Sequence, residues 1–265
     1  MVELSGVIPT IDLEEASDKI LNQKIREAGE RWGCFRVINH GVSLSLMSEM
    51  KKTVIDLFER PYEVKMRNTH VLLESGYMAP SEMNPYYETL GLFDIISPQA
   101  TLVNYAKAID GLAKDLARRL SESYGLVETN FFSECPSLFR INKYHFKPET
   151  IGKPGVQVHT DTGFLTILQD DEMLVDLKPW TILRERSFPS PRCQTRLLST
   201  SETRLQYGAM VGPMDTDLEV PSEFVDVEHP LLYKPISYKA LRKLRIAMKL
   251  HDGEALKLIT HERLE

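Results

Sequence analysis

The sequence has no long hydrophobic run, little cysteine and no excess of positive charge, and each of these absences excludes a class of protein. None of the apolar stretches in its 265 residues reaches the length needed to span a bilayer, so we expect no membrane helix and no membrane partner. Three scattered cysteines without a CxxC pair, Cys34, Cys135 and Cys193, do not suit a secreted disulfide framework. The net charge of −6 gives no support for binding nucleic acid, which usually requires a basic surface.

What remains is the composition of an ordinary globular protein. Hydrophobic residues make up 42% and charged residues 26% of the chain, a balance that argues against disorder and against a fibre. The first residues lack the basic flank and apolar run of a signal peptide. We therefore expect a cytoplasmic protein of one large domain or two small ones.

Hydrophobic periodicity places helices early in the chain and strands later. Apolar residues at helical spacing predict helices over residues 18–32, 44–60, 102–120 and 238–249. Alternating or short apolar runs predict strands over residues 7–13, 34–41, 138–146, 156–159 and 163–169. Pro9 confines the first strand to the edge of a sheet, and the stretch with Gly76, Pro85 and Pro98 suggests loops. This order predicts a helical N-terminal layer packed on an all-β core.

Regular patterning is lost over residues 177–206. Three prolines and five unevenly spaced arginines interrupt this stretch, and order returns beyond Val211. We predict three regions: residues 1–125 with helices and strands, residues 126–220 as a β core disrupted at 177–206, and residues 221–265 as a helical C-terminal region.

The tripeptide His159-Thr160-Asp161 lies between two strand-like runs. Residues two apart on an extended segment project to the same face, so the imidazole and the carboxylate would point together. They would then supply two of the three ligands of a facial iron site built from two histidines and one carboxylate. Such a tripeptide also arises often by chance, and the alternative is a hydrogen-bonded histidine at a strand end.

Several segments around this tripeptide resemble the plant-type 2-oxoglutarate/Fe(II)-dependent dioxygenase family. They are VIPTIDL, WGCFRVINHGV, ERPYEVKMR, the pair Asn142-x-Tyr144, and GFLTILQ directly after HTD. The resemblance runs from residue 7 to about residue 170 and resumes at Val211. Within the family, NKYHFKP, HTDTGFLTILQ, GPMDTDLEVPSEFVD and LYKPISY look most like the enzymes that oxidise auxin, indole-3-acetic acid, to 2-oxindole-3-acetic acid.

The resemblance implies a fold and a set of site residues. The fold would be a double-stranded β-helix (jelly roll), mainly β with flanking helices. His159 and Asp161 would bind Fe(II), Tyr144 would hydrogen-bond the distal carboxylate of 2-oxoglutarate, and Asn142 would help to orient this co-substrate. O2 and a small molecule such as auxin would be the other reactants. Two further histidines, His40 and His145, are interpreted as structural.

The sequence departs from the family at two of its motifs. The family has a second histidine ligand after the HxD pair, but no histidine occurs between His159 and His229, and His229 lies in the segment beyond the core. The family also has an Arg-x-Ser motif whose arginine pairs with the co-substrate carboxylate. The nearest candidate, Arg204, is followed by Leu205 and Gln206 and has no such serine. We therefore expect an incomplete jelly roll.

These departures leave several interpretations open. The chain is a dioxygenase, or it is a catalytically impaired isoform that acts at most as a binding or decoy protein. A third alternative is an unstable product, because missing core strands would expose unpaired sheet edges. The abrupt loss and recovery of resemblance suggests an alternative or erroneous product of a gene for a full-length enzyme. A zinc hydrolase is disfavoured, since no HExxH motif or nearby third nitrogen or sulfur ligand accompanies the pair.

Overall fold

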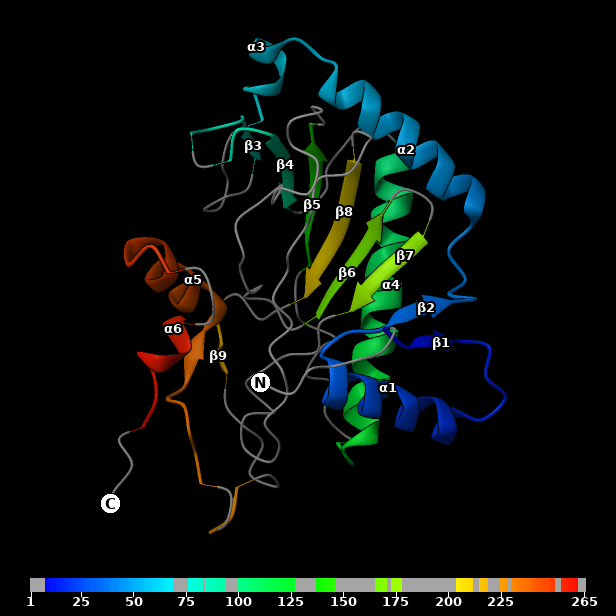
Figure 1. The fold of residues 1–265 in the computed structure, drawn as a ribbon, viewed down its shortest axis with the longest axis vertical. Helices are drawn as coiled ribbons and strands as arrows, with labels where there is room; N and C mark the ends of the chain where they lie inside the picture. Colours follow the sequence, from blue (N-terminus) through cyan, green and yellow to red (C-terminus); the bar gives the residue numbers. More distant parts are fainter. Residues whose placement is uncertain are drawn as a thin grey trace.

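The computed structural model describes residues 8–68, 76–82, 84–93, 100–126, 137–145, 165–170, 173–177, 204–211, 215–218, 225–227, 230–250 and 254–261. Its helices are α1 (Asp18–Trp32), α2 (Leu44–Phe58), α3 (Tyr62–Lys65), α4 (Ala100–Ser123), α5 (Tyr238–Ala247) and α6 (Glu254–Lys257). Figure 1 shows α1, α2 and α4 gathered on one side of a central sheet, with α5 and α6 on the other. None of these helices is long and apolar enough to cross a membrane.

Helix α1 has the bounds that the sequence predicts, and both of its ends are capped. The side chain of Ser17 accepts a hydrogen bond from the backbone N–H of Ile20 at the N-terminus, which satisfies one of the free donors there. Gly33 has a positive φ of 71° and its N–H bonds to Gly29 at the C-terminus, a conformation that favours glycine. Between these caps Leu21, Ile25 and Ala28, which lie at helical spacing, are buried.

The central sheet has eight strands in the order β1-β2-β7-β6-β8-β5-β4-β3. Their bounds are β1 (Thr10–Asp12), β2 (Arg36–Ile38), β3 (Gly76–Met78), β4 (Tyr87–Phe93), β5 (Ser137–Tyr144), β6 (Leu165–Asp170), β7 (Met173–Leu177) and β8 (Arg204–Val211). Strands β1 and β2 pair in parallel, and the other described neighbours are antiparallel. Strand β1 lies at the edge of the sheet, as Pro9 predicts. A separate pair joins β9 (Asp217–Leu218) to β10 (Ile236–Ser237).

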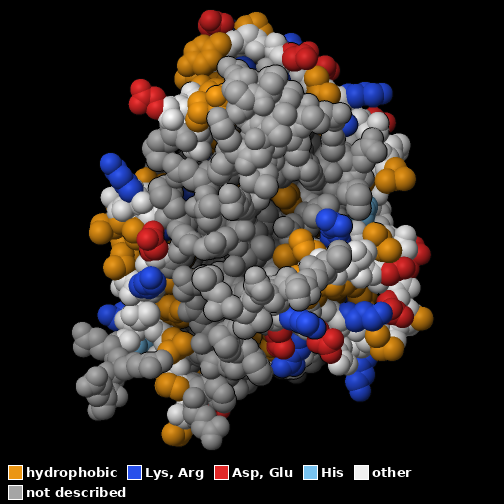
Figure 2. All heavy atoms as spheres, viewed as in Figure 1, with side chains coloured by type: hydrophobic (Ala, Val, Ile, Leu, Met, Phe, Trp, Pro, Cys, Tyr) orange, Lys and Arg blue, Asp and Glu red, His pale blue; other side chains and the backbone are white. Residues whose placement is uncertain are grey.

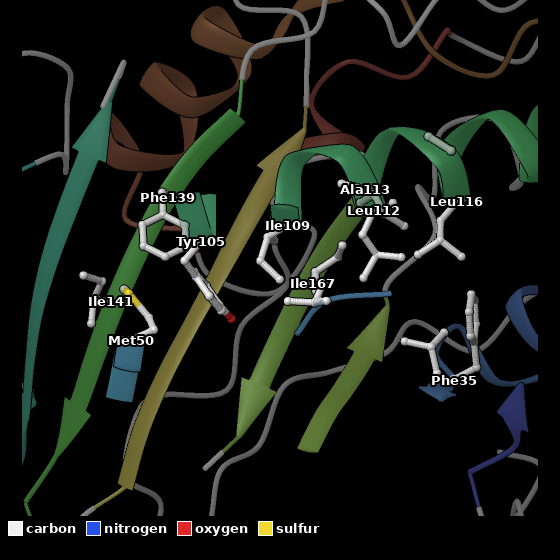
Figure 3. Close-up of a cluster of buried hydrophobic side chains, with 14 of the residues drawn as sticks. Phe35, Met50, Tyr105, Ile109, Leu112, Ala113, Leu116, Phe139, Ile141 and Ile167 are labelled. Carbon is white, nitrogen blue, oxygen red and sulfur yellow. The ribbon is translucent and has the colours of Figure 1, made fainter. Parts of the chain in front are cut away.

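The hydrophobic core lies between α4 and the sheet. Figure 3 shows Tyr105 and Ile109 of α4 facing Phe139 and Ile141 of β5, with Met50 of α2 beside them. The rings of Tyr105 and Phe139 meet edge to face with centroids 5.8 Å apart, a favoured arrangement for aromatic pairs. Since all five side chains are buried, this layer fixes which face of β5 points inward.

Two sequence predictions about the strands are wrong. The stretch interpreted as loops contains β3 and β4, and β4 pairs with β5 along its whole length. Order was expected to return only beyond Val211, but β8 begins at Arg204 and lies between β5 and β6. The strand predicted at residues 156–159 lies outside the described residues.

The coarse fold class, a sheet flanked by helices, agrees with the structure. The finer prediction of a jelly roll, and of its incompleteness, remains a prediction. The division at residue 125 is likewise a prediction, although strands from both sides of it, β4 and β5, share one sheet.

Oppositely charged side chains lie close together where α1 meets α4. Arg119 of α4 contacts Asp115 in its own helix at 2.8 Å and Asp18 of α1 at 2.7 Å. Arg118 pairs with Asp115 and Glu122 on the same helix. Figure 2 shows acidic and basic side chains intermixed over the region of α1. These contacts join the two helices and leave this part of the surface without an excess of either charge.

Candidate functional site

The candidate site is built on one face of three adjacent strands, β4, β5 and β8. Tyr144 and Asn142 of β5 are two residues apart, so their side chains share a face of the strand. On β4, Tyr87 lies opposite Tyr144 and Thr89 lies opposite Asn142. On the other side of β5, the Cα of Arg204 is the register partner of Tyr144. The pairing therefore brings together two predicted co-substrate residues and the backbone of the third.

A hydrogen-bond network joins β4 to β5 on this face. The Oδ1 atom of Asn142 accepts from the hydroxyl of Tyr87 at 3.0 Å and from the hydroxyl of Thr89 at 2.8 Å. The hydroxyl of Thr89 also lies 2.9 Å from the carbonyl oxygen of Ile141. The ring of Tyr87 packs against that of Tyr144, with centroids 5.2 Å apart and an angle of 39° between the planes.

The supporting residues Tyr87 and Thr89 are more deeply buried than the predicted binding residues. Thr89 is completely buried and Tyr87 is 9% exposed, whereas Asn142 and Tyr144 are half-buried. The phenol of Tyr144 and the amide of Asn142 can both donate hydrogen bonds, and an ionised carboxylate only accepts them. This donor set fits 2-oxoglutarate, the dicarboxylate that the family resemblance assigns to these two residues.

The opposite face of β4 carries a second polar cluster, centred on the buried carboxylate of Glu88. Its Oε2 atom accepts from Lys65 of α3 at 2.9 Å and from the hydroxyl of Tyr77 of β3 at 2.7 Å. Its Oε1 atom lies 3.0 Å from Nε2 of His145, directly after β5. This contact makes His145 part of the Glu88 cluster, and its interpretation as structural stays a prediction.

Electrostatics in this cluster favour the charged carboxylate. Burial on its own would raise the pKa of Glu88. Hydrogen bonds from His145, Lys65 and Tyr77, together with the positive charge of Lys65, outweigh burial and lower the pKa to about 2. Burial likewise acts to lower the pKa of Lys65, but Glu88 raises it overall. The cluster thus holds an ion pair that joins α3, β3, β4 and the end of β5.

His40 also has a structural position. Its Nδ1 atom accepts a hydrogen bond from the backbone N–H of Val42 at 3.1 Å, within the turn that precedes α2. Burial lowers the pKa of its imidazole, which favours the neutral ring that this bond requires.

The predicted iron ligands His159 and Asp161 lie outside the described residues, and they remain predictions. Within the ranges that the structure describes, no three His, Cys, Asp or Glu side chains are grouped to hold a metal ion. Strand β6 begins at Leu165, soon after Asp161, and pairs with β8. The chain that follows the tripeptide therefore enters the same sheet as Asn142 and Tyr144.

Comparison with known proteins identifies the family. The family model described as "non-haem dioxygenase in morphine synthesis N-terminal" matches residues 8–88. The 2-oxoglutarate-dependent dioxygenase DAO of Oryza sativa is 33% identical over 293 residues, which cover 94% of this chain and 97% of the rice protein. The chain belongs to the 2-oxoglutarate-dependent dioxygenase family. It is thus related to oxidoreductases along nearly its whole length.

Solved structures of 2-oxoglutarate-dependent dioxygenases resemble this one. The dioxygenase for auxin oxidation 1 from Arabidopsis thaliana, in binary complex with 2-oxoglutarate, is 58% identical and has a TM-score of 0.78. That match covers 84% of this chain and all of the other. The dioxygenase for auxin oxidation from rice is 31% identical with a TM-score of 0.81, over 96% of this chain and all of the other. The resemblance in the sequence to auxin-oxidising members is confirmed.

Sequence reasoning missed the residues of this dioxygenase that support the site. The sequence places Tyr87 and Thr89 in a loop-rich stretch and gives no reason to single out Glu88. Their partners lie far away in the chain, and Tyr87 and Asn142 are separated by 55 positions. Tyr87 and Thr89 alternate with Glu88 and Leu90, as residues on the two faces of a strand do, and this alternation is the signal that the sequence offers. Only the register with β5 shows that Tyr87 and Thr89 lie on the face of Asn142 and Tyr144.

Proposed function

We propose that this chain is an Fe(II)- and 2-oxoglutarate-dependent dioxygenase that oxidises a small plant metabolite of the auxin type. The proposed reaction converts indole-3-acetic acid to 2-oxindole-3-acetic acid. The observation that carries the proposal is the face of β5 on which Asn142 and Tyr144 lie together, with the backbone of Arg204 opposite Tyr144. Support for the substrate comes from the relatives named for auxin oxidation in rice and Arabidopsis thaliana.

Each proposed site residue has a distinct task. The hydroxyl of Tyr144 donates to the distal carboxylate of 2-oxoglutarate, and Arg204 pairs with the same group through its guanidinium. Asn142 orients the co-substrate, and His159 and Asp161 hold the metal. Iron, when bound with 2-oxoglutarate and O2, supplies the oxidising chemistry, and the protein supplies binding and orientation. We infer a jelly-roll fold that is incomplete, in a cytoplasmic protein without nucleic-acid or membrane partners.

A second candidate function is binding without turnover. No histidine occurs between His159 and His229, so the third ligand of a facial triad is missing at its usual place. The alignment with the rice dioxygenase spans 293 positions, more than the 265 residues of this chain, so part of that enzyme has no counterpart here. A site with two protein ligands binds iron more weakly, and the chain would then act as a decoy that keeps the co-substrate face.

One experiment separates the two candidates. The purified chain is titrated anaerobically with Fe(II) in the presence of 2-oxoglutarate, and the visible charge-transfer band of the chelate is recorded. Auxin and O2 are then added, and 2-oxindole-3-acetic acid and succinate are measured. His159→Ala should abolish the band, whereas His261→Ala, which removes an exposed histidine, should preserve it.

Each outcome of this experiment distinguishes between the two candidate functions or tests the iron site itself. A band followed by the oxidised product supports the dioxygenase. A band without product supports the binding protein. The absence of a band in a folded protein would overturn the assignment of His159 and Asp161 as a working iron site.

A further inference from the structure

We propose that Tyr87 and Thr89 are positioning residues for 2-oxoglutarate, which set the orientation of the Asn142 amide and of the Tyr144 ring. Neither residue touches the co-substrate in this proposal; each acts through a residue of β5. The inference rests on the proposed function, in which Asn142 and Tyr144 bind the co-substrate.

The amide of Asn142 has one side fixed by β4. Its Oδ1 atom accepts two hydrogen bonds, from Tyr87 and from Thr89, and a carbonyl oxygen has two lone pairs for such bonds. The Nδ2 atom occupies the other branch of the planar amide, and it has no hydrogen-bond partner within the described ranges. Within that part of the chain, its two N–H donors lie on the side away from Tyr87 and Thr89.

The direction of this amide decides whether the face attracts or repels a carboxylate. An amide that presents N–H groups donates to carboxylate oxygens, whereas a flipped amide would present its own oxygen and repel them. The paired hydroxyls of Tyr87 and Thr89 hold the first of these orientations. Thr89 is itself fixed, because it is completely buried and its hydroxyl also contacts the carbonyl of Ile141.

Tyr87 has a second effect through its ring. It is directly opposite Tyr144 in the register of β4 and β5, and the two rings are in contact at a centroid distance of 5.2 Å. The buried ring of Tyr87 limits the positions open to the half-buried ring of Tyr144. A side chain that is ordered before binding loses less entropy when the ligand arrives, so this contact favours affinity.

The opposite face of the same strands offers a matched control. The hydroxyl of Tyr77 donates to Glu88 at 2.7 Å, and Tyr77 contacts neither Asn142 nor Tyr144 in the described structure. Tyr77→Phe removes the same atom from the same sheet as Tyr87→Phe. Both variants lose a hydrogen-bonded tyrosine hydroxyl, and they differ in their connection to the candidate site.

The experiment measures 2-oxoglutarate affinity by anaerobic calorimetry with Fe(II) present, on the wild type, Tyr87→Phe, Thr89→Val, Thr89→Ser and Tyr77→Phe. We expect Tyr87→Phe and Thr89→Val each to weaken binding by about fivefold, the effect of one hydrogen bond. Thr89→Ser restores the hydroxyl and should return the affinity to within about twofold of the wild type, and Tyr77→Phe should stay within the same limit. In turnover assays the KM for 2-oxoglutarate should rise more than kcat falls.

Each result has one meaning once thermal melts have shown that the variants fold. Wild-type affinity in both Tyr87→Phe and Thr89→Val overturns the inference and leaves the proposed function intact. An equal loss in Tyr77→Phe also overturns it, because the effect would then belong to the sheet as a whole. If the folded wild type does not bind 2-oxoglutarate, the proposed function fails and this inference fails with it.

Discussion

Replacing Glu88 with glutamine preserves the size of the side chain and removes its charge, so the variant isolates what this carboxylate contributes to the fold. In the wild type the side chain of Glu88 is 4% exposed and that of Lys65 is 12% exposed. The glutamine would leave the ammonium of Lys65 enclosed without its anion. Breaking a buried ion pair in this way typically costs about 3–5 kcal/mol.

The pKa of Glu88 gives a second measure of the same contribution. Its value of about 2, against an ordinary 4.5, corresponds to about 3 kcal/mol of stability at neutral pH. The two figures agree, so we expect Glu88→Gln to lower the free energy of unfolding by about 3 kcal/mol at pH 7. For a chain of this size the melting temperature should fall by about 6–12 °C.

The pH dependence has a definite sign. The folded pKa lies below the unfolded one, so the contribution of Glu88 is complete above about pH 4.5 and is lost as the pH falls toward 2. Glutamine does not titrate. The difference in unfolding free energy between wild type and Glu88→Gln should therefore be largest near neutral pH and shrink through this window.

Urea unfolding followed by circular dichroism, at several pH values from neutral to acid, measures both quantities. Glu82→Gln is the matched control, because it makes the same chemical change at an exposed position close to the start of β4. A change of less than about 0.5 kcal/mol in Glu88→Gln, or a difference that does not shrink in acid, would refute the reasoning. The first result would mean that burial of the ion pair costs as much as its contacts return. The second would mean that the loss of stability does not come from the charge of Glu88.

Three further substitutions test the fold by urea unfolding. Gly33→Ala forces a side chain onto a backbone with φ of 71°, and we expect a loss of about 1 kcal/mol, which an unchanged midpoint would contradict. Ile141→Ala empties a completely buried position on β5, so we expect a loss of about 2–5 kcal/mol; a value below about 1 kcal/mol would place this side chain outside the core. Ser17→Ala removes the cap of α1 and should cost about 1 kcal/mol; the control is Ser48→Ala, the same change at an exposed position inside α2.

Local chemistry accounts for the elements that the sequence predicted well. Helix α1 combines an apolar face with Ser17 before it and Gly33 after it, and all three signals lie within the segment itself. Helix α4 was predicted over residues 102–120 and extends from Ala100 to Ser123. Its long apolar face explains the agreement, and the small error at each end is typical of helix boundaries.

Strands β4 and β8 were missed because their evidence is not local. In β4 the buried positions include Glu88 and Thr89, and polar residues at such positions hide the alternation of a half-buried strand. They are tolerated because Lys65, His145 and Asn142 satisfy them from elsewhere in the chain. The place of β8 between β5 and β6 is likewise set by pairing with strands that precede it in the chain. The irregular stretch before β8 contains no pattern that predicts this pairing.

The candidate site also contains residues that local sequence predicts and residues that depend on pairing between distant strands. Asn142 and Tyr144 could be predicted because they form a short motif that resembles a known family. Tyr87 could not, since its role depends on a pairing across 55 positions. The metal ligands His159 and Asp161 rest on the sequence and the family, and the spectroscopic titration addresses them directly.

The position of β5 between β4 and β8 has a consequence for how the protein is made. During synthesis β4 precedes β5, so this pair can form early, but the other edge of β5 has no partner until Val211 has left the ribosome. An unpaired edge attracts other strands, and contacts between distant parts of a chain form slowly. Nascent chains that stop before β8 should therefore depend on chaperones, whereas chains that contain β8 can cover that edge themselves.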